Sequence, residues 1–415
     1  MKKARIISLL IILQFILAVN VPINVCFAKG SEDEGYLETN ANWLEYAPVD
    51  TKASFDVEAK SALLIEFSTG RVLYEKGPNE RLAPASVTKI MTLLLTMEAI
   101  ESGKIHLDDK VSVSENASKM GGTQIYLAPG EIRTVEELIK GIAIESGNDC
   151  AVAIGEYISG TEEEFVKKMN ERASELGMNN THFVNSSGLP VANHYTSATD
   201  IAIMSKELIK HEKILVYTST YTETITEGRK QPFTMWNTNK LIKFYKGCDG
   251  LKTGTSSEAK SCISATAKRD NMRLIAIILG APNVAIRNRE ASKLFDYGFA
   301  RNEIVKLSDK NEVVGNVKVL KGKETSVNAI PKDEFLILIE KGNKKGIQKD
   351  INITKQINAG FKKGEKLGDI IASIDGKEIG RMDIVAEKSV DKAGVFHMIK
   401  RTYKSWIGFG NNVDE

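Results

Sequence analysis

The sequence predicts an α+β fold, in which helices cover an antiparallel sheet and a small all-β domain and a terminal amphipathic helix follow. β-like runs lie at both ends of residues 56–301, and helical patterns lie between them. This order lacks the regular alternation of strand and helix that builds a parallel sheet. Short β-rich runs with Gly- and Lys-rich turns then occupy residues 302–388.

Composition sets the protein class. A chain of 415 residues with 42% apolar and 27% charged residues has globular values and room for two or three domains. Its formal charge of +2 includes Lys2, Lys3 and Arg5 at the start, and without them the chain is near neutral, which argues against nucleic acid as the main partner. Four cysteines are too few for a disulfide framework, and five histidines leave little room for a multi-His metal site.

Residues 1–28 have the layout of a secretory signal peptide. The basic start is followed by an apolar run over 6–19 and by small residues before a cleavage point after Ala28. An uncleaved anchor is the alternative, although the run is short for a membrane span. Residues 29–55 are polar and acidic and are interpreted as a linker. We therefore expect an exported protein at the outer face of the cytoplasmic membrane or in the cell wall.

Local signals predict the elements of residues 56–301, the expected catalytic domain. A helix over Val87–Ile100 is apolar on nearly all sides and should be buried in a core. Thr134 and Glu137 form a capping box that begins a helix running to about Glu145. The other predicted elements are a hairpin of strands 61–67 and 71–75, helices 161–177 and 199–210, strands 251–255, 261–268 and 273–279, and a helix over 286–297.

The chain after residue 302 divides into two parts. The β domain is predicted from the runs 316–320, 334–340, 370–374 and 382–385. In the segment 389–410, apolar and basic residues separate onto opposite sides of a helix that carries a Trp near its end, which suits a membrane surface. The alternative is a helix docked on the β domain.

Three short patterns carry the candidate chemistry, and two of them occur more than once. Only context can therefore choose among the copies. The copies are Ser-x-x-Lys at 86–89, 257–260 and 389–392, Ser-x-Asn at 114–116, 146–148 and 326–328, and Lys-Thr-Gly at 252–254.

Ser86 is the best placed serine because it opens the buried helix and has Lys89 on the same face, three residues on. An amine packed against apolar residues is costly to keep charged, so the pKa of Lys89 should fall. A neutral lysine can take the proton of the serine hydroxyl and activate it as a nucleophile. The alternative is a plain N-cap serine beside a surface lysine. The pairs at 257–260 and 389–392 lie in polar stretches that should be exposed.

The other two patterns could complete a site. Gly147 should permit a tight turn that brings Ser146 and Asn148 to one side, where they could pass a proton and hold a substrate amide; a helix C-cap is the alternative. Ser114–Asn116 is predicted to be a turn. Gly254 within the strand Lys252–Thr255 should allow close approach of another backbone, so a substrate peptide could add alongside as an extra strand.

The three patterns in this order resemble the signature of penicillin-binding proteins and active-site serine β-lactamases. The surrounding sequence is most similar to the low-molecular-mass D-alanyl-D-alanine carboxypeptidases, serine peptidase family S11, and to their sporulation-associated members. The resemblance spans about residues 55–300 and rests on the stretches 84–92, 141–149, 176–183, 249–254 and 296–299. It implies the penicillin-binding-protein fold and a family layout with a small β domain and a membrane-binding C-terminal helix.

The resemblance also implies a role for each site residue. Ser86 would be the acylated nucleophile and Lys89 its general base, with Ser146 and Asn148 in the proton relay and substrate contacts. The terminal carboxylate would be bound by Lys252, Thr253, Gly254 and Thr255, assisted by Arg287, for which a surface arginine is the alternative. Backbone N–H groups of Ser86 and Thr255 would form the oxyanion hole. The partners would be peptidoglycan stem peptides and β-lactams, with no metal and no organic cofactor.

Two segments depart from the family pattern, and three rival functions remain. The departures are Asn185–Leu189 and Glu258–Cys262, neither of which is expected to touch the three motifs. A serine β-lactamase is disfavoured because residues 183–200 contain no glutamate. A zinc peptidase through His194 and Asp200 is incomplete, and His194 should instead stabilise a loop. The third rival is a non-catalytic wall-binding protein or β-lactam sensor.

Overall fold

The computed structural model describes residues 55–394 and residue 399. The expected signal peptide, nearly all of the linker and most of the predicted terminal helix lie outside the described residues. The described start of that helix, 389–394, is not helical: Val390 pairs with Phe361 and is buried in the core of the β domain, so the prediction is wrong for these residues. The region up to residue 301 and the region after it are described separately below.

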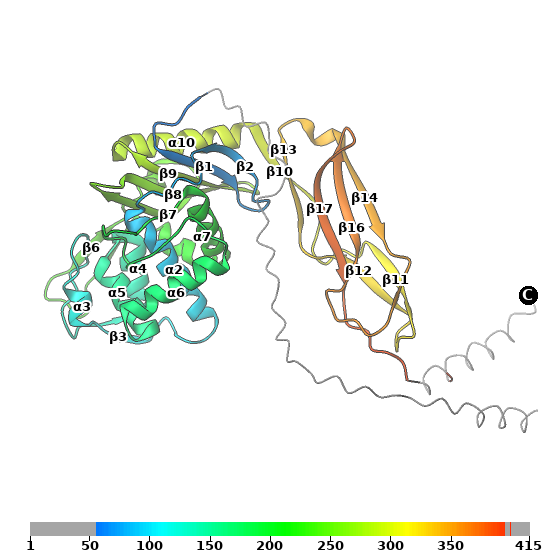
Figure 1. Ribbon diagram of the computed structural model, residues 1–415, viewed down its shortest axis with the longest axis horizontal. Helices are drawn as coiled ribbons and strands as arrows, with labels where there is room; N and C mark the ends of the chain where they lie inside the picture. Colours follow the sequence, from blue (N-terminus) through cyan, green and yellow to red (C-terminus); the bar gives the residue numbers. More distant parts are fainter. Residues whose placement is uncertain (1–54, 395–398, 400–415) are drawn as a thin grey trace, which may run out of the picture. The chain divides into compact units, whose positions relative to one another are not determined.

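The first region is built on a five-stranded antiparallel sheet (Figure 1). Its order is β2 (Val72–Lys76), β1 (Ser61–Glu66), β9 (Met272–Ala281), β8 (Lys260–Arg269) and β7 (Cys248–Ser256). β1 pairs with β9, so the early hairpin and the late strands form one sheet across about 200 intervening residues. The predicted antiparallel sheet is confirmed. β7 lies at its edge, where one side remains open to another strand.

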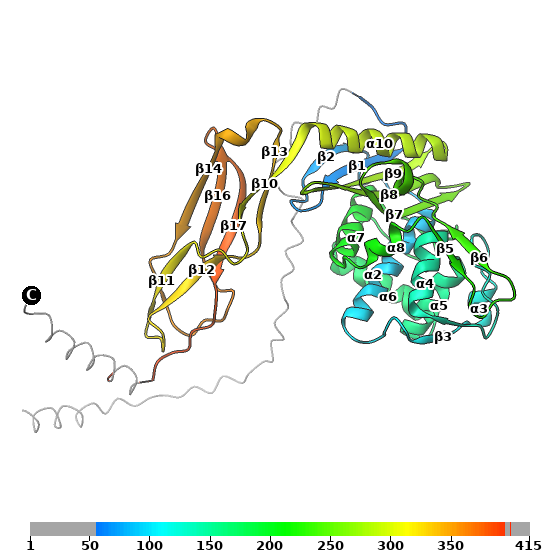
Figure 2. The same cartoon turned by 180° about the vertical axis from the view of Figure 1, so that it is seen from behind.

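Helices cover both faces of this sheet (Figures 1 and 2). α10 (Val284–Arg301) packs on one face, and α2 (Lys89–Glu101) and α7 (Ala198–Lys210) pack on the other. Alternate residues of β1 accordingly enter the two cores: Leu63 and Ile65 face the helical core, and their neighbours face α10.

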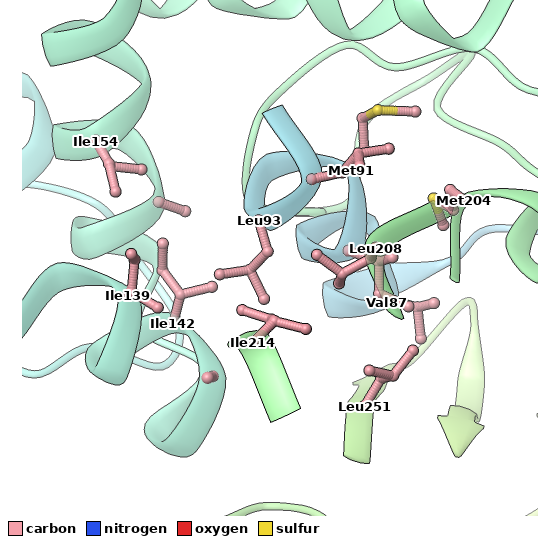
Figure 3. Close-up of a cluster of buried hydrophobic side chains, with 14 of the residues drawn as sticks. Val87, Met91, Leu93, Ile139, Ile142, Ile154, Met204, Leu208, Ile214 and Leu251 are labelled. Carbon is pink, nitrogen blue, oxygen red and sulfur yellow. The ribbon is translucent and has the colours of Figure 1, made fainter. Parts of the chain in front are cut away.

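Leu93 of α2 lies in the centre of the helical core and is 1% exposed. Figure 3 shows its side chain directed toward Ile142 and Ile214, with Ile139 close by. At the start of the helical segment, Val87 meets Leu251 of the edge strand β7 in the same cluster. The helix predicted to be apolar on nearly all sides is therefore the buried centre of the domain.

The capping box at Thr134 is present with both of its hydrogen bonds. The helix that it begins differs from the prediction in its second half. α4 (Val135–Lys140) continues as a π-helical turn, η2 (Gly141–Glu145), and ends at Ser146. A Cβ at Gly141 would stand 2.4 Å from Cys150 Sγ, so the glycine lets the following helix approach this turn.

The remaining predicted helices are α6 (Glu162–Glu175) and α7, which begin at the caps Thr161 and Ser197. Short elements that the sequence did not indicate complete the region. They are η1 (Ala85–Thr88), β3 (Lys110–Ser112), α3 (Glu115–Ser118), β4 (Ile132–Thr134), α5 (Asn148–Ser159), α8 (Ile214–Thr218), β5 (Thr222–Ile225), β6 (Phe233–Trp236) and α9 (Leu241–Phe244).

The region after residue 301 is built of strands around a core of its own. β10 (Asn302–Ser308) pairs with β13 (Phe335–Glu340), and a six-stranded sheet has the order β14, β16, β17, β12, β11, β15. All four predicted runs are strands, and the sequence missed the rest. The bounds in that sheet are β11 Gly315–Leu320, β12 Ser326–Pro331, β14 Ile347–Ile353, β15 Gln356–Asn358, β16 Lys366–Ile374 and β17 Lys377–Ala386, with a short helix η3 at Asn343–Gly346. Within the described part of the chain, none of the helices has the length and apolar character needed to cross a membrane.

Replacing Leu93 by alanine should lower the free energy of unfolding by about 2–5 kcal/mol, because a cavity would open at the centre of the core. Urea unfolding followed by helical circular dichroism measures this, since among residues 55–394 the long helices all lie before residue 302. Val216→Ala is the control, because Val216 is 64% exposed and its truncation should change stability by less than about 0.5 kcal/mol. Equal losses in the two variants would contradict this description of the core.

Candidate active site

The first motif folds into a tight turn that brings its two functional groups together. Ser86 lies in the short helix η1 and Lys89 is the first residue of α2. Lys89 Nζ lies 3.0 Å from Ser86 Oγ, 2.6 Å from Asn148 Oδ1 and 2.6 Å from the main-chain oxygen of Ser187. Lys89 is fully buried and Ser86 is half-buried. The alternative of a surface lysine beside an N-cap serine is therefore wrong.

Burial lowers the pKa of Lys89 well below its ordinary value of 10.5, and the charge of Lys252 lowers it further. Asp149 and Cys150 act in the opposite direction and raise this pKa. Loss of hydration disfavours the ammonium form, so the neutral amine becomes accessible. A neutral amine at hydrogen-bond distance from a serine hydroxyl is the arrangement required of a general base.

The Ser-x-Asn motif is placed at the same point by an unusual backbone conformation. Ser146 ends the π-helical turn with φ 71° and ψ 31°, in the left-handed region. Gly147 was expected to make the turn, but its φ is −56° and Ser146 itself takes the strained conformation. A Cβ at Gly147 would stand 2.8 Å from Asp149 Oδ1, so this glycine serves close packing instead. Asn148, the first residue of α5, is anchored by donating from Nδ2 to Gly121 O at 2.6 Å.

Asp149 is a functional residue that the sequence reasoning did not single out. Its buried carboxylate accepts hydrogen bonds from the backbone N–H groups of Ile125, Leu127 and Cys150. It thereby holds the loop 121–127, whose carbonyl groups in turn fix Asn148. An acid in the first turn of a helix was the only signal in the sequence, and it is common to many helices.

The Lys-Thr-Gly motif lies on the edge strand β7, directly against the Ser86 turn. A Cβ at Gly254 would stand 2.7 Å from the Pro84 oxygen and 2.9 Å from the Ser86 nitrogen. The close backbone approach predicted for Gly254 is therefore real, and it is an approach to the turn that carries Ser86. Thr253 Oγ1 donates to Thr238 Oγ1 at 2.7 Å, and Thr255 is exposed.

Two buried cations lie on this side of the site. Lys252 is 1% exposed and Arg287 is 2% exposed, so the alternative of a surface arginine is wrong. Burial, together with the charge of Arg287, lowers the pKa of Lys252 to about 7, and Glu145 acts against this. Burial also lowers the pKa of Arg287 to about 10. Arg287 donates to the neutral side chain of Asn288 at 2.9 and 3.0 Å. An anion bound here would relieve the repulsion between the two cations.

Neither Asn185–Leu189 nor Glu258–Cys262 was expected to touch the three motifs, and both do. Cys262 pairs with Gly254, and Ser261 with Thr255, between β8 and β7. The segment Asn185–Leu189 contacts the Ser-x-x-Lys motif. Its Ser187 carbonyl is one of the three oxygens around Lys89 Nζ. Its Gly188 has φ +81°, and a Cβ there would fall 1.9 Å from the Ala85 oxygen. The segment departs from the family pattern in its side chains, but a main-chain carbonyl accepts a hydrogen bond whatever the side chain is.

His194 stabilises this loop, as predicted. Its Nδ1 accepts from the Val184 N–H at 3.0 Å, so Nε2 carries the proton and donates to Thr88 Oγ1 at 2.8 Å. The imidazole thus ties the loop to the turn that carries Ser86. Burial lowers the pKa of His194 to about 4.

The other copies of the motifs do not join the site. Ser257 and Lys260 are exposed in the turn between β7 and β8, and Ser389 and Lys392 are exposed after β17. Ser114 was predicted to lie in a turn but caps the short helix α3, where its side chain accepts from the Ala117 N–H. The third Ser-x-Asn copy lies on β12 of the second region.

The three cysteines of the described region are free and buried, and burial raises the pKa of each thiol. They are Cys150, Cys248 and Cys262. Within residues 55–394 no group of three or more His, Cys, Asp and Glu side chains could hold a metal ion.

Comparison with known proteins agrees with this geometry. The family model described as peptidase S11, D-alanyl-D-alanine carboxypeptidase, matches residues 48–283. The chain belongs to this carboxypeptidase family. A second model, described as penicillin-binding protein 5, C-terminal domain, matches residues 303–392.

Individual members of the carboxypeptidase family cover most of the chain. The D-alanyl-D-alanine carboxypeptidase DacF of Bacillus subtilis is 48% identical over 367 residues, which are 88% of this chain and 94% of that protein. DacC of Escherichia coli is 31% identical over 376 residues, which are 88% of this chain and 93% of that protein. Penicillin-binding protein 5 of Haemophilus influenzae is 30% identical and has a TM-score of 0.72, covering 81% of this chain and 99% of that chain.

His194 should make stability depend on pH. Its folded pKa of about 4 lies below the ordinary 6.5, so between these values the unfolded chain binds a proton that the folded chain does not. The stability contributed by neutral His194 is complete above the ordinary pKa and is lost as the pH falls toward the folded pKa. Between about pH 7 and about pH 4.5 the wild type should lose about 2 kcal/mol more than His194→Gln, whose amide keeps both hydrogen bonds without titrating.

Urea unfolding at the two pH values measures this difference. Substitution of the exposed His106 by Gln is the control and should leave the wild-type pH dependence in place. Parallel pH profiles of wild type and His194→Gln would show that the loop does not depend on a neutral imidazole.

Proposed function

We propose that this protein is a serine D-Ala-D-Ala carboxypeptidase that removes the terminal D-alanine from peptidoglycan stem pentapeptides through a Ser86 acyl-enzyme. The observation that carries the proposal is the buried Lys89 amine, 3.0 Å from the Ser86 hydroxyl and next to two buried cations that favour a carboxylate. Membership of the carboxypeptidase family supports the same substrate.

Acylation uses Lys89 as the general base. Neutral Lys89 takes the Ser86 proton while Ser86 Oγ attacks the carbonyl carbon of the D-Ala–D-Ala bond. The N–H groups of Ser86 and Thr255 stabilise the oxyanion. The C–N bond then breaks as Ser146 gives its proton to the departing amine and regains one from the Lys89 ammonium, so free D-alanine leaves and Lys89 is neutral again. Water next attacks the ester while Lys89 takes its proton, and Lys89 returns this proton to Ser86 Oγ as the ester C–O bond breaks and the shortened peptide leaves.

The cation pair selects the end of a peptide. Lys252 and Arg287 attract the terminal carboxylate. The Thr255 hydroxyl donates a hydrogen bond to it, and so does the Thr253 hydroxyl after it turns away from Thr238. An extended substrate adds to the open edge of β7, beside Gly254. Because a carboxylate binds here and Ser86 attacks the adjacent amide, the enzyme acts as a carboxypeptidase. Penicillins carry a carboxylate next to a strained amide, so they acylate the same serine.

The rest of the chain serves to place this activity outside the cell. We propose that residues 1–28 direct export, that 29–55 link to the catalytic domain 56–301, and that 389–410 associates with the membrane beyond the β domain 302–388. The match of residues 303–392 to a penicillin-binding protein 5 C-terminal domain supports the presence of the β domain.

Ser86→Ala should abolish both β-lactam labelling and D-alanine release, because no other described serine has a buried lysine as its base. Soluble protein of residues 29–388 is incubated with a penicillin and with a peptide ending in D-Ala-D-Ala, and intact mass, peptide mapping and D-alanine release are measured. Ser257→Ala and a full-length Ser389→Ala are the controls and should keep both activities.

Each other result of this experiment has a definite meaning. Rapid loss of the adduct with hydrolysed β-lactam and no D-alanine would indicate a β-lactamase. Folded protein with neither adduct nor D-alanine would leave a wall-binding protein.

Lys252→Met should remove the preference for a free terminal carboxylate. A hydrogen bond to a charged group contributes about 1.5–3 kcal/mol, so the ratio of kcat/KM for a D-Ala-D-Ala peptide over its C-terminal amide should fall by about 10-fold to 100-fold. Lys260→Met is the control. Lys260 is exposed and belongs to the Ser-x-x-Lys copy outside the site, so this variant should keep the wild-type ratio. An unchanged ratio in Lys252→Met would remove Lys252 from carboxylate binding.

A further inference from the structure

The Ser187–Gly188 peptide group contacts the site from a loop that carries none of the three motifs. Its carbonyl oxygen accepts from Lys89 Nζ at 2.6 Å. Its N–H donates to Asn185 Oδ1, also at 2.6 Å. Because a peptide group is planar, the side chain that holds the N–H also fixes the direction of the carbonyl.

Asn185 holds this turn with both ends of its amide. Besides Gly188, its Oδ1 accepts from the Ser187 N–H at 3.2 Å and from Ser187 Oγ at 3.3 Å. Its Nδ2 donates to the Leu189 oxygen at 2.9 Å. Gly188 has φ +81°, in the region that favours glycine. A glycine leaves the preceding peptide group free to rotate, and the hydrogen bonds to Asn185 restrict this rotation.

The number of N–H donors on the Lys89 amine explains why the Ser187 carbonyl matters for catalysis. An ammonium has three N–H donors, whereas a neutral amine has two and one lone pair. Two of the three oxygens around Lys89 Nζ, Asn148 Oδ1 and Ser187 O, can only accept, and both lie at 2.6 Å. The identity of the Asn148 oxygen is settled because its Nδ2 donates to Gly121 O. The two N–H groups of the neutral amine are therefore used, and the lone pair is left facing Ser86 Oγ.

We propose that Asn185 is a positioning residue for acylation: by holding the Ser187–Gly188 peptide group, it directs the lone pair of Lys89 at the Ser86 hydroxyl. This inference rests on the proposed function of Ser86 and Lys89. Asn185 acts only through the Ser187 carbonyl and does not touch the reacting atoms.

Without Asn185 the Ser187 carbonyl can rotate away, and two effects should follow. The neutral amine loses its orientation, so the rate constant of acylation falls while noncovalent binding of the β-lactam does not change. The ammonium also loses one acceptor, which favours the neutral form, so the acid limb of the pH profile should move to lower pH. General loosening of the site would admit water and raise the pKa of Lys89 instead, which moves the limb the opposite way.

Other charged or titratable groups also face Lys89 or its neighbour, and they must stay unchanged in the test. They are Lys252 from β7 and Asp149 and Cys150 from α5, with His194 against the neighbouring Thr88. Asn185→Ala alters none of these side chains.

The experiment measures single-turnover acylation by a fluorescent penicillin across a pH series, in the wild type and in Asn185→Ala. The final adduct mass gives the active fraction. General-base catalysis supplies about 100-fold to 10,000-fold, and partial loss of orientation should lower the plateau rate constant by about 10-fold to 100-fold. The acid limb should shift to lower pH, and the binding constant of the first complex should stay within about 2-fold of wild type.

Asn170→Ala is the matched control. Asn170 holds the chain just before Asn185 through Phe183, accepting from its N–H at 2.9 Å and donating to its oxygen at 2.8 Å. The same substitution there loosens the loop without releasing the Ser187–Gly188 peptide group. The plateau rate constant of acylation and the acid limb of its pH profile should therefore match wild type. Asn185→Asp keeps the oxygen that accepts from Gly188 and should recover most of the rate, with its acid limb at higher pH because of the added negative charge.

The outcomes separate the two proposals. A wild type that forms no adduct would refute the proposed function. A wild type that acylates, with Asn185→Ala indistinguishable from Asn170→Ala in plateau and limb, would refute the positioning role alone. If Asn185→Ala does not fold, Asn185→Ser gives the same comparison at smaller amplitude, because its hydroxyl is a weaker acceptor for the turn.

Discussion

Burial of one amine is the constraint on which the rest of this site depends. Lys89 Nζ lies in the interior of the catalytic region. Its hydrogen-bond partners in the described part of the chain are a hydroxyl, an amide oxygen and a main-chain carbonyl, and none of them is a carboxylate. A fully desolvated ammonium is unfavourable, so the fold lowers the pKa of Lys89, as its proposed role as general base requires. The same burial reduces the stability of the folded state, as is common where activity requires a strained or desolvated group.

Three segments far apart in the chain have to meet at this amine, and close backbone approaches make the meeting possible. Gly254 lets the edge strand β7 touch the Ser86 turn, and Gly188 lets the 185–189 loop touch it from another direction. Asp149 fixes the loop that anchors Asn148. The site is therefore a junction of a helix start, an edge strand and two loops, each fixed by backbone contacts.

The two sides of the junction have different electrostatics. Around Lys89 the partners are neutral oxygens, which leave the amine free to change its protonation state. On the other side, the buried side chains of Lys252 and Arg287 give an excess of positive charge, which an incoming carboxylate can compensate. The proposed proton-transfer centre and the proposed carboxylate site thus lie side by side, which is the combination needed to cleave the last amide bond before a free carboxylate.

The sequence by itself determined the antiparallel sheet, the buried helix, the β domain and the copy of each motif that could be functional, because apolar periodicity and local caps are encoded within a few residues. It did not determine the π-helical turn with its left-handed Ser146, the burial of Arg287 or the role of the 185–189 loop. These depend on contacts between segments distant in the chain: Gly141 against Cys150, Arg287 against the Cys262 oxygen, and a Ser187 carbonyl against Lys89. A main-chain carbonyl leaves no mark in the residue types, so only the tertiary structure decided which oxygens would surround the amine.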